Sequence, residues 1–219
     1  MLPLLGSTAV ASPLNPWGSA IARDSAVFVP YLYVYPDGVS QTVYGGVGLT
    51  DRADVTFGAG AFVPFDGEAQ SSLELFPRYF VTPAVGLSPH LYWTPGTDRV
   101  TLAPELHLNH ARGWFAGVVN LGWRPTFGAD GPTAGTVALI VAPELRITDR
   151  TSVFVEVDPT FSLEGDAAAM LVVPGFGTTL DPSGRHTVSI GLQVPVLPQG
   201  GPASVGAAYT LVIPPPSEG

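Results

Sequence analysis

The sequence predicts an all-β fold, a closed antiparallel up-and-down transmembrane β-barrel of about 12 strands with short loops. The first observation is composition, because 26 Gly and 23 Pro in 219 residues oppose long helices. The second is the scarcity of charge: charged residues make up 12% of a chain that is 46% hydrophobic. The third is the regular succession of alternating apolar runs and turn residues from residue 25 onward.

Twelve runs of alternating apolar residues follow one another, separated by clusters of Gly, Pro, Asp, Asn and Thr. A tilted strand needs about 9 to 11 residues to cross a bilayer, whereas strands of soluble proteins average about 5 or 6. The runs therefore have the length of membrane-crossing strands. We expect strands over residues 25–36, 40–50, 53–65, 71–82, 83–94, 98–109, 113–126, 133–147, 151–163, 167–180, 184–196 and 203–213.

The segments that flank these runs are short. Residues 1–11 end in Ala9-Val10-Ala11, which resembles the end of a secretory signal without its basic start. We interpret them as a remnant of an export signal, and an ordinary apolar terminus is the alternative. Residues 12–24 contain Asn15-Pro16, a helix-start pattern, and predict either a leader or a short plug helix. The barrel covers residues 25–213, and residues 214–219 form a Pro-rich C-terminal tail.

Alternation along the runs separates an apolar face from a polar face. In the ninth run, Val153 and Val155 share one face, while Glu156 and Asp158 lie on the other. A soluble sandwich also alternates, but its polar face carries many Lys and Glu, whereas these polar faces are sparse and mixed in sign. The pattern predicts an apolar exterior in lipid around a polar interior. The barrel must close, because an open sheet edge in hydrocarbon leaves backbone groups without hydrogen-bond partners.

Aromatic residues are concentrated toward the ends of several runs. Their placement predicts a girdle at the membrane interfaces, although each ring also suits the core of a soluble sandwich. With an even number of strands, both termini lie at the end with the shorter turns, which is the periplasmic end in bacterial outer-membrane barrels. The predicted girdle residues are Tyr31, Tyr33, Tyr35, Trp93, Trp114, Trp123 and Phe127.

Alternation also selects the polar residues that face the interior. Two interpretations remain open for them: salt-bridged ladders that brace the wall, or a constriction whose charges select solutes. The candidate pore-lining residues are Glu74, Arg78, His90, Arg99, Glu105, His107, Asn120, Arg124, Glu144, Arg146, Glu156, Asp158 and Gln193.

Glycine and aromatic residues face inward together on the second, third and fifth runs. Inward glycine relieves wall curvature and lets rings pack over it. It would also make a smooth, partly apolar channel side that suits small hydrophobic or amphipathic solutes. These positions are Tyr44, Gly46, Gly48, Gly58, Gly60, Phe62, Gly86 and Tyr92.

Composition and motifs disfavour several functions. A net charge of −9 without any Lys opposes binding to nucleic acid, which needs a basic surface. The chain has no Cys, which excludes disulfides and thiolate metal sites. The four histidines, His90, His107, His110 and His186, are scattered and lack a local nucleophile motif. We therefore expect no enzyme, no catalytic residue, no metal site and no cofactor.

Three stretches resemble a known class of protein. They are the turn GLTDRADV at 48–55, the Ala-Pro-Glu-Leu stretches at 103–106 and 142–145, and the closing run at 206–213. They resemble Gram-negative outer-membrane barrels, and more narrowly the transporter-like barrels of aromatic-degradation pathways and the long-chain fatty-acid transporters. The resemblance implies location in the bacterial outer membrane. The closing run is similar to the signal read by the barrel insertion machinery, but it ends in Ile213 rather than Phe and precedes the Pro-rich tail.

The function that these observations favour is passive passage of small, hydrophobic or amphipathic solutes through a porin-like outer-membrane channel. Its expected partners are the lipid bilayer, the barrel insertion machinery and small solutes, and we expect a monomer. The alternative is a non-conducting structural or adhesion barrel whose interior is filled by its own side chains. A third class, a secreted soluble β-sandwich with lectin-like binding, conflicts with the long apolar faces.

Overall fold

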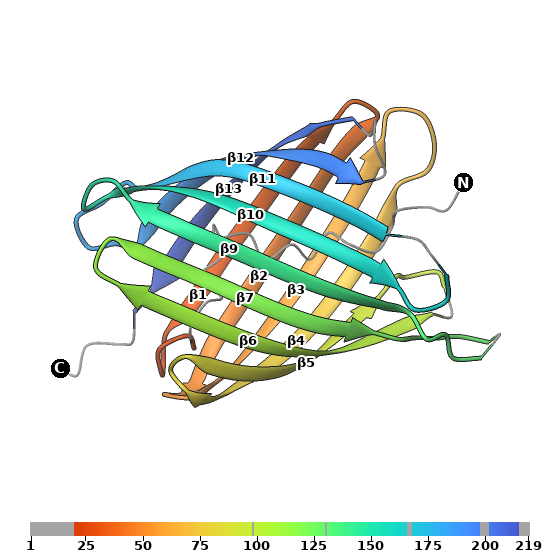
Figure 1. Ribbon diagram of the computed structural model, residues 1–219, viewed down its shortest axis with the longest axis horizontal. Helices are drawn as coiled ribbons and strands as arrows, with labels where there is room; N and C mark the ends of the chain where they lie inside the picture. The colour runs from red at the N-terminus through yellow and green to blue at the C-terminus, as the bar shows by residue number, and fades with distance from the viewer. Residues whose placement is uncertain (1–19, 98, 130, 166–167, 198–201, 215–219) are drawn as a thin grey trace.

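The computed structural model describes residues 20–97, 99–129, 131–165, 168–197 and 202–214. Antiparallel strands joined by turns and loops make up this part of the chain (Figure 1). It contains no helix that is long and apolar enough to span a membrane. The strands are β1 (Ala26–Tyr35), β2 (Gly38–Thr50), β3 (Ala53–Pro64), β4 (Gln70–Thr82), β5 (Val85–Trp93), β6 (Val100–Arg112), β7 (Phe115–Arg124), β8 (Thr126–Phe127), β9 (Thr136–Arg146), β10 (Thr151–Ser162), β11 (Ala168–Thr179), β12 (His186–Leu197) and β13 (Ser204–Ile213).

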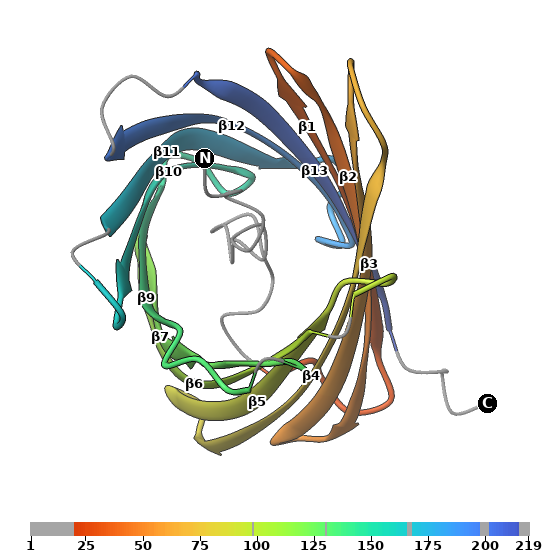
Figure 2. The same cartoon turned by 90° about the vertical axis from the view of Figure 1, so that its right-hand side faces the viewer.

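All strands except β8 form a closed antiparallel ring, which confirms the predicted fold (Figure 2). Consecutive strands pair from β1 to β7, β7 pairs with β9, and pairing continues to β13. The ring closes because β1 pairs with β13, with Ala26 opposite Ile213. The start of β1 and the end of β13 therefore lie at the same end of the barrel, as an even strand number requires. Each strand of the ring has a partner on both sides, as a sheet in hydrocarbon needs.

Each of the predicted runs overlaps one strand of the ring, but the seventh is interrupted. β7 ends directly before Pro125, and β8 begins directly after it. β8 keeps the register of β7 against β6, since Glu105 pairs with Gly122 and Val100 pairs with Phe127. Pro125 has no N–H to donate, which explains the local break. β8 lies outside the ring because it pairs with β6 alone.

The two faces of the strands differ in exposure as alternation predicts. In β10, Phe154 and Glu156 are buried, whereas Val153 and Val155 are 37% and 41% exposed. The buried face points into the barrel, and the exposed face points away from it. Large hydrophobic side chains cover the exterior on many strands, among them Phe28, Leu32, Leu75, Leu87, Leu121, Phe176, Ile190 and Leu192.

The tyrosines of β1 do not belong to the predicted aromatic girdle. Tyr31 and Tyr33 are 3% and 7% exposed and point into the barrel. Tyr35 also turns inward, where its hydroxyl donates a hydrogen bond of 3.2 Å to Gln193 Oε1. The prediction was wrong for these three residues because β1 is apolar on both faces, so alternation did not distinguish them. The exposed members of the predicted girdle are Trp93, Trp114, Trp123 and Phe127.

Several inward glycines lie directly opposite an aromatic residue of the neighbouring strand. A Cβ added at Gly58 would lie 2.5 Å from the ring of Tyr44, and one added at Gly206 would lie 2.2 Å from the ring of Tyr33. Each ring thus occupies the space that a larger side chain would fill. This packing agrees with the predicted placement of aromatic rings over inward glycines. The opposed pairs are Tyr44 and Gly58, Phe80 and Gly86, Tyr33 and Gly206, and Phe154 and Gly175.

Residues 20–24 approach the inner wall before β1 begins. Arg23 bridges to Gly48, and a Cβ at Gly48 would lie 2.0 Å from the carbonyl oxygen of Ala22. Ile21 is buried within the barrel. These described residues are not helical. The rest of the predicted leader or plug helix at 12–24 lies outside the described residues, as do the predicted signal remnant at 1–11 and the tail beyond Pro214.

Candidate functional site

Most of the candidate pore-lining residues lie inside the barrel. Glu105, Glu144 and Asp158 are half-buried there. Arg99 and Arg146 are exposed, because Arg99 precedes β6 and Arg146 is the last residue of β9. These two arginines therefore lie at the ends of the wall. The buried candidates are Glu74, Arg78, His90, His107, Asn120, Arg124, Glu156 and Gln193.

A hydrogen-bonded group centred on His90 lies on the inner wall of β2, β4, β5 and β6. His90 Nε2 lies 3.2 Å from Glu74 Oε2, and His90 Nδ1 lies 3.5 Å from Glu105 Oε1. The Tyr44 hydroxyl donates to Glu74 at 3.2 Å, and the Tyr92 hydroxyl lies 2.8 Å from His90 Nδ1. The imidazole thus contacts two carboxylates and the phenol of Tyr92, while the phenol of Tyr44 holds one of the carboxylates. We call these five residues the histidine cluster.

Arg124 of β7 extends the histidine cluster. Its Nη2 lies 3.8 Å from Glu105 Oε1, and its guanidinium carbon lies 5.6 Å from the centre of the Tyr92 ring. The ring of Phe76 packs against His90 with a centroid separation of 4.4 Å. Aromatic surface and charge therefore share one wall of the barrel, an arrangement that can contact both the apolar and the polar part of a solute.

The candidate residues omit Asp54, which forms a fully buried ion pair with Arg78. Arg78 donates from Nε to Asp54 Oδ1 and from Nη2 to Asp54 Oδ2, both at 2.8 Å, and both side chains are 0% exposed. The backbone N–H of Ile21 donates to Asp54 Oδ2 at 2.9 Å. A sequence signal did exist, because Asp54 has the same parity as Gly58 and Gly60. Asp54 also lies within the strand predicted over residues 53–65.

Other polar contacts join adjacent strands. His107 Nδ1 lies 3.0 Å from Asn120 Oδ1 between β6 and β7. Ser204 donates to Gln193 Oε1 at 2.8 Å between β13 and β12. These contacts favour the bracing interpretation for the residues that make them, since each links two neighbouring strands through buried groups.

Glu156 and Asp158 of β10 differ from the other interior charges. All four of their carboxyl oxygens are buried with no hydrogen-bond partner outside this pair in the described part of the chain. The hydroxyl of Tyr31 is likewise buried and without a partner there. Buried polar groups are normally hydrogen-bonded, so this acid pair is chemically unusual.

The four histidines are spread over the barrel. His90 and His107 are buried inside, whereas His110 is exposed. His186 Nδ1 lies 2.5 Å from the Tyr209 hydroxyl. Within the described ranges, no group of three or more His, Cys, Asp or Glu residues is arranged to hold a metal ion.

Comparisons with known proteins find similarity in structure only. No protein-family model and no curated protein matches the chain. A KdgM porin has a TM-score of 0.63 and 8% identity, covering 84% of this chain and 98% of its own. An outer membrane channel from Pseudomonas putida F1 has a TM-score of 0.63 and 11% identity, covering 90% and 98%. A NanC porin has a TM-score of 0.58 and 6% identity, covering 86% and 98%.

At these identities the likeness concerns the fold alone. The narrower resemblance to barrels of aromatic-degradation pathways and to fatty-acid transporters remains a prediction. The chain shares the β-barrel fold of these porins and of the outer membrane channel.

Proposed function

We propose that the protein is a porin-like channel of a Gram-negative outer membrane through which small solutes diffuse. The observation that carries this proposal is a closed ring of strands with an apolar exterior and charged residues inside. An apolar exterior is stable in lipid, and a polar interior is typical of barrels that conduct solutes. The shared fold with two porins and an outer membrane channel supports the same function.

The solutes that suit this interior are small and amphipathic. The rings of Tyr44, Phe76 and Tyr92 lie on the same wall as the carboxylates of Glu74 and Glu105. Aromatic surface favours the apolar part of a solute, and the charged groups favour its polar part. Purely hydrophobic solutes would offer no hydrogen-bonding group to the polar side chains of this wall.

The protein is expected to reach the membrane through the barrel insertion machinery and to act as a monomer. The closed ring supports this proposal, because no strand edge of the ring is left to pair with a second copy. The closing strand β13 contains the run that resembles the insertion signal.

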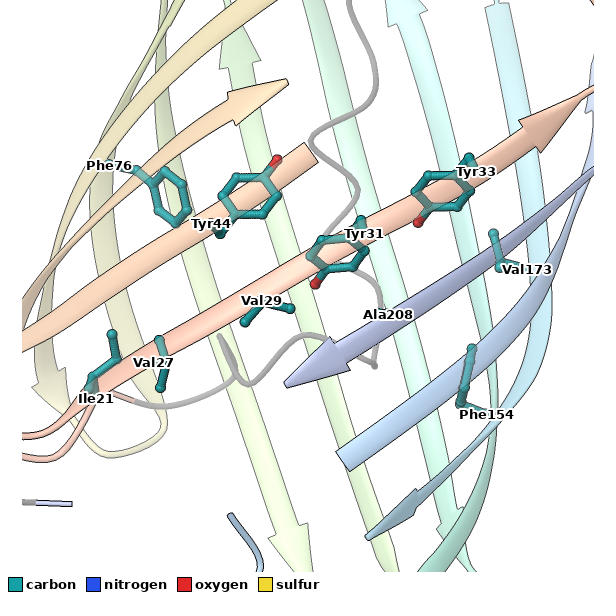
Figure 3. Packing of buried hydrophobic residues seen from close by; sticks show 10 residues of the cluster. All are labelled: Ile21, Val27, Val29, Tyr31, Tyr33, Tyr44, Phe76, Phe154, Val173 and Ala208. Atoms are coloured by element: carbon teal, nitrogen blue, oxygen red, sulfur yellow. The ribbon is translucent and has the colours of Figure 1, made fainter. Parts of the chain in front are cut away.

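A second candidate function is a non-conducting structural barrel. It is favoured by the cluster of buried hydrophobic residues inside the ring, which includes Tyr31, Tyr33, Tyr44, Phe76 and Phe154 (Figure 3). Large rings inside a barrel reduce the space through which a solute can pass. Such a protein would serve as a wall element or as an attachment point.

Conductance in planar lipid bilayers separates these two functions. Purified full-length protein is inserted, its folded state is verified by heat-modifiable migration on a gel, and protein-free membranes serve as the control. A channel gives stepwise currents and makes liposomes permeable to small amphipathic solutes. Folded, inserted protein that gives neither current nor permeability contradicts the channel and favours the non-conducting barrel.

A further inference from the structure

Two acidic side chains lie next to each other inside the barrel on β10. Glu156 and Asp158 are two residues apart and therefore point to the same face of the strand. Glu156 is 0% exposed, and the carboxyl oxygens of both residues are buried with no hydrogen-bond partner outside the pair among the described residues. The two carboxyl groups also interact with each other. Two negative charges buried side by side are unfavourable unless a donor or a positive charge compensates them.

The arginine that acts on Asp158 also has other contacts. Arg124 interacts with Asp158 electrostatically. Its guanidinium group, however, lies 3.8 Å from Glu105 and packs over the ring of Tyr92. Arg124 therefore compensates the acid pair only in part.

Tyrosine side chains of β1 complete the surroundings of the acid pair. Tyr31 is 3% exposed, its hydroxyl has no hydrogen-bond partner in the described structure, and it interacts electrostatically with Glu156. The rings of Tyr31 and Tyr33 stack with a centroid separation of 6.4 Å. Phe154, on the same face of β10 as Glu156, belongs to the same interior cluster (Figure 3). A buried hydroxyl without a partner and several aromatic rings thus lie in the same part of the interior as the two carboxyl groups.

We propose that Glu156, Asp158 and Tyr31 bind the primary ammonium group of an organic cation inside the barrel. An ammonium group has three N–H donors, which match two carboxylates and a phenol oxygen. The neighbouring aromatic rings accept the attached methylene groups and stabilise the positive charge through their faces. This site names a solute class for the proposed channel. Transport of the cation rests on the proposed function, whereas its binding to the site can be measured without transport.

Other occupants fit the acid pair less well. A proton shared between the carboxyl groups would satisfy one donor and one acceptor and leave the other oxygens without partners. Calcium prefers six to eight oxygen ligands and magnesium a full octahedral shell. The acid pair offers two carboxylates, and no group of three or more His, Cys, Asp or Glu among the described residues is arranged to hold a metal ion.

Calorimetric titration of the folded full-length protein in detergent micelles tests the proposal. The probe is butylammonium chloride, and sodium chloride at the same ionic strength is the reference titrant. Wild-type protein is expected to bind butylammonium at one saturable site. Glu156→Gln should weaken this binding about tenfold or more, because one counter-charge is lost. Glu68→Gln, which removes an equal charge from the exposed connection between β3 and β4, should leave it unchanged.

A second measurement does not depend on any variant. Saturation of the tyrosine ring protons by NMR should transfer to the butyl methylene groups if the cation lies beside Tyr31 and Tyr33. The proposal is overturned if wild-type protein does not bind butylammonium, if Glu156→Gln and Asp158→Asn bind it as wild type does, or if no transfer occurs. Binding without conductance would contradict the channel and leave this site intact, whereas conductance without binding would contradict this site alone.

Discussion

Asp54 and Arg78 face each other inside the barrel through two hydrogen bonds of 2.8 Å, and neither side chain is exposed. They occupy directly opposed positions on β3 and β4. Removing one partner leaves the other charge buried without compensation. Asp54→Asn is therefore expected to lower the free energy of unfolding by about 3 to 5 kcal/mol. Urea unfolding of the protein in liposomes measures this loss.

The exposed pair of Arg23 and Asp24 provides a matched control. Its N–O separation is 3.4 Å, and the two side chains are 66% and 64% exposed. Asp24 has a φ of 59°, a conformation that Asn also tolerates. Asp24→Asn should change the free energy of unfolding by less than about 1 kcal/mol. Equal losses in the two variants would contradict a stabilising role specific to the buried pair.

Gly206→Ala should destabilise the barrel because its new methyl group would meet the ring of Tyr33 at 2.2 Å. Tyr33 is buried and stacked on Tyr31, so the ring has little freedom to move away. The expected loss is about 1 to 3 kcal/mol in the free energy of unfolding. Gly117→Ala is the control, since the nearest atom to its Cβ would be 3.5 Å away. A similar loss at Gly117 would show that alanine itself, rather than the ring, is responsible.

Asp181, in the connection between β11 and β12, should titrate at unusually low pH. Hydrogen bonding from the Ser183 hydroxyl, with help from the backbone N–H of His186, lowers the pKa of Asp181 to about 2. An unperturbed Asp has a pKa of about 3.9. This connection is therefore stabilised above about pH 4, and the contribution disappears as the pH falls toward 2.

Ser183→Ala should raise the pKa of Asp181 toward its ordinary value, which carboxyl carbon NMR in micelles would detect. A titration curve of Asp181 that is the same in both proteins would show that the hydroxyl is not the cause.

Glu105→Gln should lower the cation-to-anion permeability ratio of the proposed channel. It removes a negative charge 3.8 Å from Arg124 and leaves the arginine less compensated. A unit charge at about 4 to 8 Å in water is worth about 0.5 to 1 kcal/mol, so the permeability ratio should change about two- to fivefold. Reversal potentials in a salt gradient measure the ratio. Glu68→Gln is the control, and an equal change there would place the selective charge outside the interior.

The fold could be predicted because two signals in the sequence are strong. Strand length and alternation are set by the backbone, and both persist along the runs from residue 40 to residue 213. β1 lacks the second signal, since Val27 and Tyr31 on the inner face are as apolar as Phe28 and Leu32 on the outer face. The direction in which its tyrosines point is therefore set by how β1 pairs with β2 and β13 in the closed ring.

The site was predicted only as a set of inward residues. Alternation places Glu74, His90 and Glu105 inside, but their contacts depend on the register between strands. The register between β4 and β5 shifts between Phe80 and Thr82, and no local sequence pattern predicts this shift. The unpartnered state of Glu156 is equally a property of the assembled wall, because it depends on which side chains other strands bring near it.

Site-directed spin labelling of β10 tests most directly whether the apolar face of the strands contacts lipid. The chain has no Cys, so single Val153→Cys, Val155→Cys and Glu156→Cys variants can each be labelled selectively. In liposomes, oxygen dissolved among the acyl chains should relax the labels at residues 153 and 155, whereas an aqueous nickel chelate should not reach them. The label at residue 156 should be relaxed less by oxygen than these two labels. A nickel chelate that reaches residues 153 and 155 as readily as water-exposed loops would contradict a lipid-facing exterior.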